Sequence, residues 1–335
     1  MQAVILASGR GRRFAPLTDE VPKPLLPVAN WPLIDYLLTS VNELEFSEIF
    51  VTLGYGANQL NQFLDTVVLQ HHIIPILAPN WEQGPLASFQ AVLPHLASEV
   101  PCILLPGDLY LSPNILRLIT TTSAELALLF DPTATRPGTL LQVDTANTVT
   151  QLIQSAVHLP DFFSVLPVLR GTRRFFMDAL AVHPSPPQTV FELLQGWLVH
   201  EHNLVGIPIH KDLWCDVDSP ADLVALNHHL LTQGWPPSPR PPGTYVPAGT
   251  AMKGPLQSST LTLGAKAVVE GPVLLGAGVR IAEGGTVSGG TSLGHDTTVQ
   301  RNASLTRCLT LPNTQVPANA DLRDVIMDAD GNVVR

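Results

Sequence analysis

The sequence contains few cysteines and few charged side chains. Only three of its 335 residues are cysteine, and Asp, Glu, Lys and Arg together make up 14%. Cys102, Cys215 and Cys308 lie far apart, show no metal-ligand spacing, and cannot form a fully paired disulfide framework because their number is odd. We therefore expect three thiols that behave as small, buried apolar residues.

Long hydrophobic runs are also missing. Hydrophobic residues make up 45% of the chain, yet no apolar stretch reaches the ~18 residues expected of a membrane span. The first apolar run is short and is followed, not preceded, by arginines, which argues against a signal peptide. These absences favour a cytoplasmic globular protein without a membrane partner, long enough for two domains.

Positive charge is scarce and unevenly placed. The formal net charge is −10, which argues against nucleic acid as a partner. Even so, Arg10, Arg12, Arg13 and Lys23 all lie close to the start of the chain. A cluster of cations in an acidic protein indicates a local site for an anion.

The surroundings of this cluster support an anion site. Residues 3–7 form an apolar run typical of a buried parallel strand, and residues 8–13 (SGRGRR) break it. Glycines let backbone N–H groups approach an anion closely, and arginines supply charged, forked donors. Such a loop alone is as often an ordinary turn, but the strand, the glycines and the cations together predict a phosphate site.

The first forty residues resemble a known family. The strings GRGRRFAPLT (9–18), PKPLLPV (22–28) and PLIDY (32–36) are similar to the motifs G-x-G-[TS]-R-[LF]-x-P-L-T, P-K-P-L-x-P-V and P-L-I-x-Y of the sugar-phosphate nucleotidyltransferases, or NDP-sugar pyrophosphorylases. Arg12 stands where the family usually has Thr or Ser, and Ser8 where Ala or Gly is common. The resemblance implies an enzyme that joins an NTP to a sugar 1-phosphate and releases pyrophosphate.

The resemblance also implies roles for individual residues. Arg13 and Lys23 would be the catalytic cations, with Arg13 at the β- and γ-phosphates and Lys23 beside the α-phosphate. The remaining nucleotide contacts would come from the start of the loop and from a turn that opens a later helix: Ala7, Ser8, Gly9, Gly11, Arg12, Gln83, Gly84 and Pro85. Without the resemblance, residues 83–85 would be an ordinary strand-to-helix connection.

Two aspartates are candidate metal ligands. Apolar runs alternating with helical patterns predict a Rossmann-like, doubly wound, mostly parallel α/β sheet, whose ligands lie at the carboxyl ends of the strands. One such run ends on Gly107-Asp108, and WCDVDSPADL (214–223) resembles the family's W-x-D-[IV]-G-T-P-x-D-L. The resemblance implies that Asp108 and Asp216 hold Mg²⁺, which prefers oxygen ligands. Asp218 replaces the family's glycine, and Ser219 is typical of a helix N-cap.

One family element is missing. Many members have the string E-K-P in the second half of this domain, with a lysine that holds the sugar phosphate. No lysine occurs here between Lys23 and Lys211. Arg170, Arg173, Arg174 or Lys211 remain as candidates for this role, and the gap leaves the acceptor open.

The pattern changes after residue 232. Residues 233–243 are rich in proline and predict a linker between a catalytic domain, 1–232, and a second domain, 244–335. In the second domain an aliphatic residue recurs every six positions: Leu263, Val269, Leu275, Ile281, Val287, Leu293, Val299, Leu305 and Leu311. This period predicts a hexapeptide-repeat β-helix of about three triangular coils with a cap at 325–334. The family resemblance implies that it is left-handed, and we expect it to form a homo-oligomer.

Three alternatives remain open. Some β-helix domains are acyltransferases with a catalytic histidine, and His295 is the only histidine in residues 244–335, although a lone exposed histidine usually has no such role. Some relatives with this two-domain plan are regulatory or scaffold subunits, but these typically lose the loop cations or the metal aspartates. Other relatives are cytidylyltransferases that act on phosphocholine or a similar phosphate. The base, the acceptor, the oligomeric state and the pathway are not specified.

Overall fold

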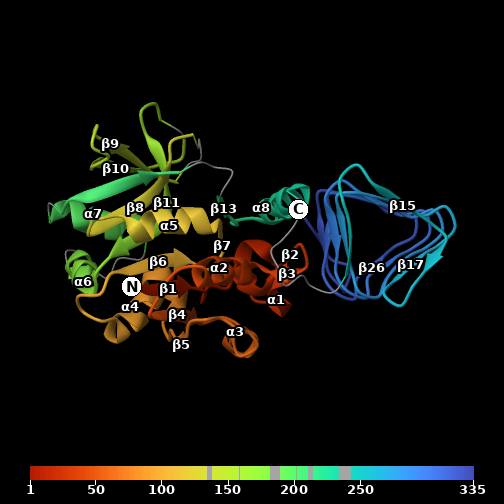
Figure 1. The fold of residues 1–335 in the computed structure, drawn as a ribbon, viewed down its shortest axis with the longest axis horizontal. Coiled ribbons are helices and arrows are strands. Elements are labelled where there is room, and N and C mark those ends of the chain that lie inside the picture. The colour runs from red at the N-terminus through yellow and green to blue at the C-terminus, as the bar shows by residue number, and fades with distance from the viewer. Residues whose placement is uncertain (134–137, 158, 182–188, 201, 210–213, 234–242) are drawn as a thin grey trace. The chain divides into compact units, whose positions relative to one another are not determined.

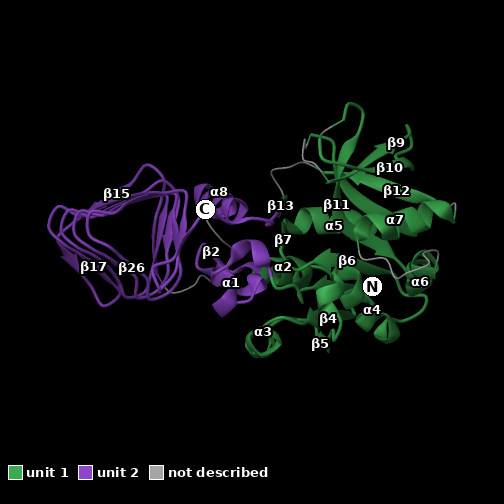
Figure 2. Ribbon diagram, turned by 180° about the vertical axis from the view of Figure 1, so that it is seen from behind, with its two compact units in different colours: residues 1–10, 34–215 green, residues 11–33, 216–335 purple. Residues whose placement is uncertain are grey.

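The computed structural model describes every residue except 134–137, 158, 182–188, 201, 210–213 and 234–242. The chain forms two compact units, one of residues 1–10 and 34–215 and the other of residues 11–33 and 216–335 (Figure 2). Most of the predicted linker lies outside the described residues, so the limits 1–232 and 244–335 stay a prediction. None of the described helices is long and apolar enough to cross a membrane.

The first unit is built on a nine-stranded sheet with a parallel core (Figure 1). The core strands run in the order β6 (Cys102–Pro106), β1 (Gln2–Leu6), β4 (Glu48–Leu53) and β5 (Ile73–Leu77). The central strand β1 is parallel to both neighbours and is buried on both faces, which explains its continuous apolar run. The connecting helices are α2 (Leu33–Asn42), α3 (Ala57–Leu64) and α4 (Pro85–Val92). The predicted Rossmann-like sheet is therefore confirmed.

Helix α3 ends before the apolar pattern around it does. Apolar residues at helical spacing continue to residue 69, but the helix ends at Leu64. The Thr66 hydroxyl donates to the carbonyl oxygen of Phe63 at 2.7 Å. A β-branched side chain that bonds to the backbone in this way competes with helix continuation.

The remaining strands extend the sheet beyond β6. They are β8 (Leu126–Asp131), β9 (Gly138–Val143), β10 (Val149–Ser155), β11 (Phe163–Gly171) and β12 (Leu204–Pro208). Strand β11 is antiparallel to β6, β8 and β9, and β9 and β10 form an antiparallel pair. The helices α5 (Pro113–Thr121), α6 (Arg173–Ala181) and α7 (Val190–Val199) belong to this half. Phe89, Phe176 and Trp197 are fully buried in its core.

The second unit contains the β-helix, shown in blue in Figure 1. Three sheets of short strands are stacked: β14-β19-β22-β25-β28-β29, β15-β18-β21-β24-β27 and β16-β17-β20-β23-β26. Their bounds are β14 Gly243–Val246, β15 Ala251–Lys253, β16 Leu256–Gln257, β17 Leu261–Leu263, β18 Val268–Glu270, β19 Val273–Gly276, β20 Val279–Ile281, β21 Thr286–Ser288, β22 Thr291–Leu293, β23 Thr298–Val299, β24 Ser304–Thr306, β25 Leu309–Thr310, β26 Gln315–Val316, β27 Asp321–Arg323, β28 Ile326–Met327 and β29 Val333–Val334. The predicted left-handed parallel β-helix is confirmed.

The register of the coils corrects one part of the predicted repeat. Leu263 pairs with Ile281, 18 residues later, as three six-residue repeats require. After the turn at Arg307 the interval falls to 17, so that Leu293 pairs with Thr310 and Val299 with Val316. Leu311 is therefore not in the repeating row, and its place there was wrongly predicted. The shorter coil was hidden because another leucine happens to follow Thr310.

Antiparallel strands flank the parallel coils of the β-helix. At the start, β14, β15 and β16 pair antiparallel with β19, β18 and β17. At the end, β29 folds back against β28, while β26 and β27 are the last strands of the other two sheets. Each antiparallel strand covers the edge of the parallel strand with which it pairs. The cap predicted at 325–334 contains this last pair.

Candidate functional site

In the first unit, the start of the glycine loop is fixed by three hydrogen bonds. Ala7 N donates to Thr52 Oγ1 at 3.0 Å, and Tyr55 N donates to the carbonyl oxygen of Ser8 at 2.9 Å. The Ser8 and Ser88 hydroxyl oxygens lie 2.5 Å apart. Ser88 is in α4. The structure therefore brings Ala7 and Ser8 beside the helix whose opening turn the resemblance assigns to nucleotide contacts.

Two glycines allow the loop to pack closely on its neighbours. A Cβ atom on Gly54 would lie 2.6 Å from the Ser8 carbonyl oxygen and 2.7 Å from Trp81 Cγ. A Cβ on Gly107 would lie 2.8 Å from the Leu6 carbonyl oxygen, to which Gly107 N donates at 2.8 Å. These approaches exclude any larger residue without a backbone shift. Asp108 follows directly and therefore lies at the carboxyl edge of the sheet, beside β1.

The predicted nucleotide contacts at residues 83–85 lie at the start of helix α4. Gln83 ends the 3₁₀ turn η3 (Trp81–Gln83), Gly84 has φ 119° and Pro85 is the first residue of the helix. Gly84 suits this backbone conformation because it lacks a Cβ, and proline suits the first helical position. The open N–H groups of this first turn are suited to polar or anionic ligand atoms.

An aromatic pair that sequence reasoning missed adjoins these residues. The Tyr55 ring contacts the Trp81 ring edge-on at 6.0 Å between centroids, and the Arg10 guanidinium lies 5.2 Å from the Tyr55 centroid. Tyr55 is separated from the loop by more than forty residues, so no local signal links them. Together with Gly54, these side chains form the wall of the loop in the first unit.

In the second unit, Gly11 and Lys23 pack against each other. Gly11 is left-handed, with φ 69°, and a Cβ there would lie 2.7 Å from Lys23 Cβ. Lys23 is only 7% exposed, and its Nζ lies 5.2 Å from the centre of the Phe14 ring. The Thr18 hydroxyl donates to the Gly11 carbonyl oxygen at 3.1 Å. The predicted loop residues Gly11 and Lys23 are thus brought together by a tight turn.

Arg13 and Asp218 form an ion pair in the same unit. Arg13 Nη2 lies 2.7 Å from Asp218 Oδ1, and the two side chains are 67% and 47% exposed. Arg12 is exposed and lies beside Arg13 in η1 (Arg12–Phe14). The carboxylate oxygens of Asp216 and Asp218 lie within 4.8 Å of each other. The structure therefore gives Asp218, where the family has glycine, a direct contact with a predicted catalytic arginine.

The predicted metal ligands lie at the ends of short strands. Asp108 precedes β7 (Leu109–Leu111), and Asp216 ends β13 (Trp214–Asp216), which pairs with β7. Ser219 caps helix α8 (Pro220–Thr232) through a reciprocal bond with Asp222, as predicted, so the capping role does not use Asp216. Carboxylates are the oxygen ligands that suit a hard cation such as Mg²⁺.

Arg170 does not fit the role of the missing phosphate lysine. It pairs with Ile103, near the amino end of β6, and so lies at the sheet edge opposite Asp108. Arg170 is 9% exposed, and its guanidinium donates to the carbonyl oxygens of Ile119, Thr120 and Ala124 at 2.8–3.1 Å. Burial lowers the pKa of this group. Arg170 therefore stabilises the end of α5.

Three other residues were candidates to hold the acceptor phosphate. Arg173 opens α6 at the same edge as Arg170 and donates to the Leu96 carbonyl oxygen at 3.4 Å, and Arg174 follows it in the helix. Lys211 lies outside the described residues. The residue that holds the acceptor phosphate is thus left open by the structure.

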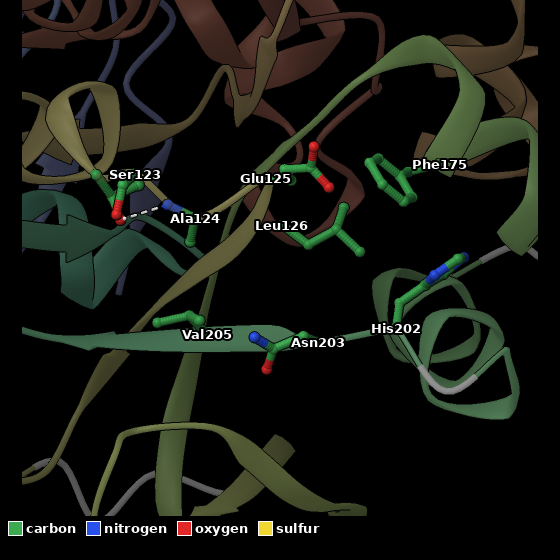
Figure 3. A pocket seen from close by; sticks show the side chains of 9 residues that line it. Ser123, Ala124, Glu125, Leu126, Phe175, His202, Asn203 and Val205 are labelled. Atoms are coloured by element: carbon green, nitrogen blue, oxygen red, sulfur yellow. Dashed lines mark hydrogen bonds between the residues drawn. The ribbon is translucent and has the colours of Figure 1, made fainter.

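A cavity of about 480 Å³ lies near Arg170, at the amino ends of β8 and β12. Figure 3 shows Phe175 and His202 on one side of it, with Glu125 and Leu126 facing them. The His202 ring meets Phe175 edge-on at 4.9 Å. None of the predicted site residues lines this cavity.

A second cavity, of about 580 Å³, adjoins the β-helix within the second unit. Pro27, Asn30 and the turn around His295 line it. His295 Nδ1 lies 3.1 Å from Asp296 Oδ2, and both side chains are more than half exposed. An exposed histidine beside its sequence neighbour gives no specific support for acyl transfer.

Comparisons with known proteins identify one matching family and several relatives. Residues 3–155 match the MobA-like NTP transferase domain family. The chain is 22% identical over 234 residues to the bifunctional protein GlmU of Methanococcus aeolicus. This alignment covers 69% of this chain and 54% of that protein. It is 24% identical over 252 residues to a putative mannose-1-phosphate guanyltransferase of Sulfolobus acidocaldarius, covering 70% of this chain and 65% of that protein. The chain thus spans between half and two thirds of these relatives.

A solved structure shows the same fold. The inositol-1-phosphate CTP transferase from T. maritima superposes with a TM-score of 0.55 at 19% identity, over 66% of this chain and 90% of that one. The predicted resemblance is confirmed: residues 3–155 match the MobA-like NTP transferase domain family, the chain is similar to sugar-phosphate nucleotidyltransferases, and it continues into a left-handed β-helix.

Proposed function

We propose that this protein transfers a nucleotidyl group from an NTP to a sugar 1-phosphate. The observation that supports this most directly is the packing of Gly11 against Lys23, which sets a buried cation beside a glycine turn followed by exposed arginines. A phosphate-binding loop needs backbone N–H groups and cations close together. An ordinary solvated turn would not bury its lysine.

The reaction would be an in-line substitution at phosphorus. A phosphate oxygen of the acceptor forms a bond to the α-phosphorus, the bond from the α-phosphorus to the bridging oxygen breaks, and pyrophosphate leaves with that electron pair. Two anions must meet, so the protein acts chiefly by positioning and neutralising charge. Lys23 would face the α-phosphate, while Arg13 and the N–H groups of Gly9 and Gly11 would hold the β- and γ-phosphates.

Asp108 and Asp216 would hold Mg²⁺ through their carboxylate oxygens. The bound ion would offset negative charge on the phosphate oxygens. Ala7, Ser8 and Arg12 would complete the nucleotide contacts of the loop, and Gln83, Gly84 and Pro85 would face the base. We also propose that the protein is cytoplasmic and assembles as a homo-oligomer through its β-helix.

The acceptor is the least defined part of the proposal. The names of two matched proteins specify mannose 1-phosphate and inositol 1-phosphate. Both acceptors present a phosphate monoester next to a ring of hydroxyl groups. We therefore propose a sugar 1-phosphate as acceptor, with a polyol phosphate or phosphocholine as the alternatives to be tested with it.

The test is pyrophosphate release with Mg²⁺ across the NTPs and dTTP, each against sugar 1-phosphates, inositol 1-phosphate and phosphocholine. We expect release with one pair and a loss of more than about a hundredfold in Asp108→Asn, because removing one charge-stabilising group typically has this effect. Asp161→Asn is the matched control, since Asp161 is exposed and asparagine tolerates its φ of 65°. A folded protein that neither binds nucleotide nor releases pyrophosphate would instead be a regulatory or scaffold subunit.

A further inference from the structure

A single buried asparagine connects three segments of the second unit. Asn227 lies in α8 and is fully buried. Its Oδ1 accepts hydrogen bonds from Ala29 N at 2.8 Å and from Ser292 Oγ at 2.7 Å, and its Nδ2 donates to the Gly290 carbonyl oxygen at 2.9 Å. The side chain thus bonds the hairpin of β2 (Pro27–Val28) and β3 (Trp31–Pro32) to the β-helix around β22.

The buried polar groups around Asn227 depend on one another for their hydrogen bonds. Ser292 is also fully buried, so loss of any of these partners would leave a polar group without water to replace it. The neighbouring residue His228 reinforces the contact, since its Nδ1 lies 3.1 Å from the Gly289 carbonyl oxygen. At Gly290, which has φ 86°, a Cβ would already lie 3.0 Å from His228 Cγ. Only glycine permits α8 to approach the β-helix at this point.

The hairpin turn is held at a second point. Ala29 and Asn30 form the turn with φ of 45° and 60°, left-handed values typical of a two-residue type I′ turn. Asparagine tolerates this conformation, whereas alanine disfavours it. Asn30 Nδ2 donates to the carbonyl oxygen of Leu293 at 2.9 Å. The turn therefore relies on the β-helix and α8 to keep its shape.

This hairpin lies a short distance along the chain from Lys23. Lys23 begins the 3₁₀ turn η2 (Lys23–Leu25), β2 begins two residues after that turn, and Leu33 N closes the segment by donating to the Leu26 carbonyl oxygen at 3.0 Å. Residues 22, 24 and 27 are prolines, which make the connection stiff. A displacement of the hairpin would therefore reach Lys23 rather than be absorbed between them.

We propose that Asn227 is a positioning residue for nucleotide binding, through which the β-helix keeps Lys23 in place. This inference rests on the proposed function, because it concerns the nucleotide that Lys23 would contact. It gives the β-helix a role in the site of its own chain, in addition to any role in assembly.

The test compares three variants of the full chain. Asn227→Ala removes all three bonds, and Asn30→Gly removes only the bond to Leu293 while glycine keeps the left-handed turn favourable. Thr297→Val is the control, because the Thr297 hydroxyl is buried in the β-helix and bonds within it, to Thr310 Oγ1 at 3.1 Å. We expect nucleotide affinity to fall about tenfold in Asn227→Ala and about threefold in Asn30→Gly, with KM for the NTP rising more than kcat falls.

Two readouts separate positioning from general destabilisation. Thr297→Val should lower the melting temperature as a buried hydroxyl loss does, yet keep nucleotide affinity within about twofold of the parent. Amide hydrogen exchange in residues 22–33 should speed up in Asn227→Ala and not in Thr297→Val. Unchanged amide exchange and unchanged nucleotide affinity in both Asn227→Ala and Asn30→Gly would overturn the proposal. If the parent protein binds no nucleotide, the exchange result alone still decides whether Asn227 holds the loop, while the proposed function fails separately.

Discussion

Two arginines in different regions of the molecule show how differently the chain uses scarce positive charge. In the loop after β1, Arg13 is 67% exposed and contacts one exposed carboxylate, that of Asp218. At the end of α5, Arg170 is 9% exposed and donates to three backbone carbonyl oxygens. The first contact is screened by solvent and easily exchanged for a ligand anion, whereas the second replaces the hydration of a helix end. The exposed partner fits the binding role proposed for Arg13, whereas the buried partners make Arg170 part of the framework.

The most direct way to break this comparison is to make the same substitution at both sites. Arg170→Met should lower the free energy of unfolding by about 3 kcal/mol, because three carbonyl groups lose a charged donor. Arg13→Met should change stability by less than about 0.5 kcal/mol and weaken nucleotide binding instead. Urea unfolding and nucleotide titration of both variants measure the two effects. Similar loss of stability in both would show that exposure does not separate the two roles.

A second prediction concerns the wall that supports the loop. Gly54→Ala should destabilise the protein by about 2 kcal/mol and weaken nucleotide binding, because the new methyl group collides with Ser8 and Trp81. Gly9→Ala is the matched control for stability alone, since a Cβ there would have nothing within 4 Å, while Gly9 is itself a proposed nucleotide contact. Thermal unfolding of both variants and nucleotide affinity of Gly54→Ala check this. Equal effects at both glycines would mean that loop flexibility, not close packing, decides the outcome.

A third prediction concerns the pH dependence of stability. Burial raises the pKa of Asp35, in the first turn of α2, from 3.8 to about 6. The folded state therefore holds this proton more tightly than the unfolded state, so stability from this group is greatest below pH 4 and falls as pH rises towards 6. Asp35→Asn should remove about 1–2 kcal/mol of this loss above pH 6, after allowing for solvent screening. Urea unfolding at pH 4.5 and pH 7 should show a smaller difference in the variant than in the parent.

The smallest expected effect concerns the acid that faces Arg13. Asp218→Asn removes the charge that competes with a phosphate for Arg13, so nucleotide affinity should rise about threefold at low salt and less at high salt. Titrations at two ionic strengths measure this. Weaker binding in the variant would instead indicate that Asp218 acts with Asp216 on the metal side of the site.

Much of the fold follows from local sequence patterns. The parallel core was predictable because β1, β4 and β6 are buried on both faces and so read as continuous apolar runs. The β-helix was predictable because each coil repeats the previous one. The turn at Arg307 was not predictable, since a coil shortened by one residue still places a leucine at position 311.

The site was less predictable, because its residues meet across long stretches of chain. Gly11, Arg13 and Lys23 could be found from one short segment, and the structure packs Gly11 against Lys23. The ion pair of Arg13 and Asp218 joins residues 205 positions apart, and no local pattern indicates it. Asn227 did leave a signal, since it occupies a position on the apolar face of α8 between Leu223 and Leu230, where a polar residue needs a buried partner.

The change of coil length from 18 to 17 residues has a consequence for how this chain tolerates insertions and deletions. A strand in the β-helix contacts only the coils directly above and below, so a whole coil can be added or removed with little effect on the rest. Removal of a number of residues that is not a multiple of six would turn later aliphatic side chains away from the interior, unless a corner absorbs the difference. The corner at Arg307, with φ 52°, shows that one residue can be absorbed in this way. Length variants of this domain should therefore cluster near multiples of six residues, and other changes should fall at corners.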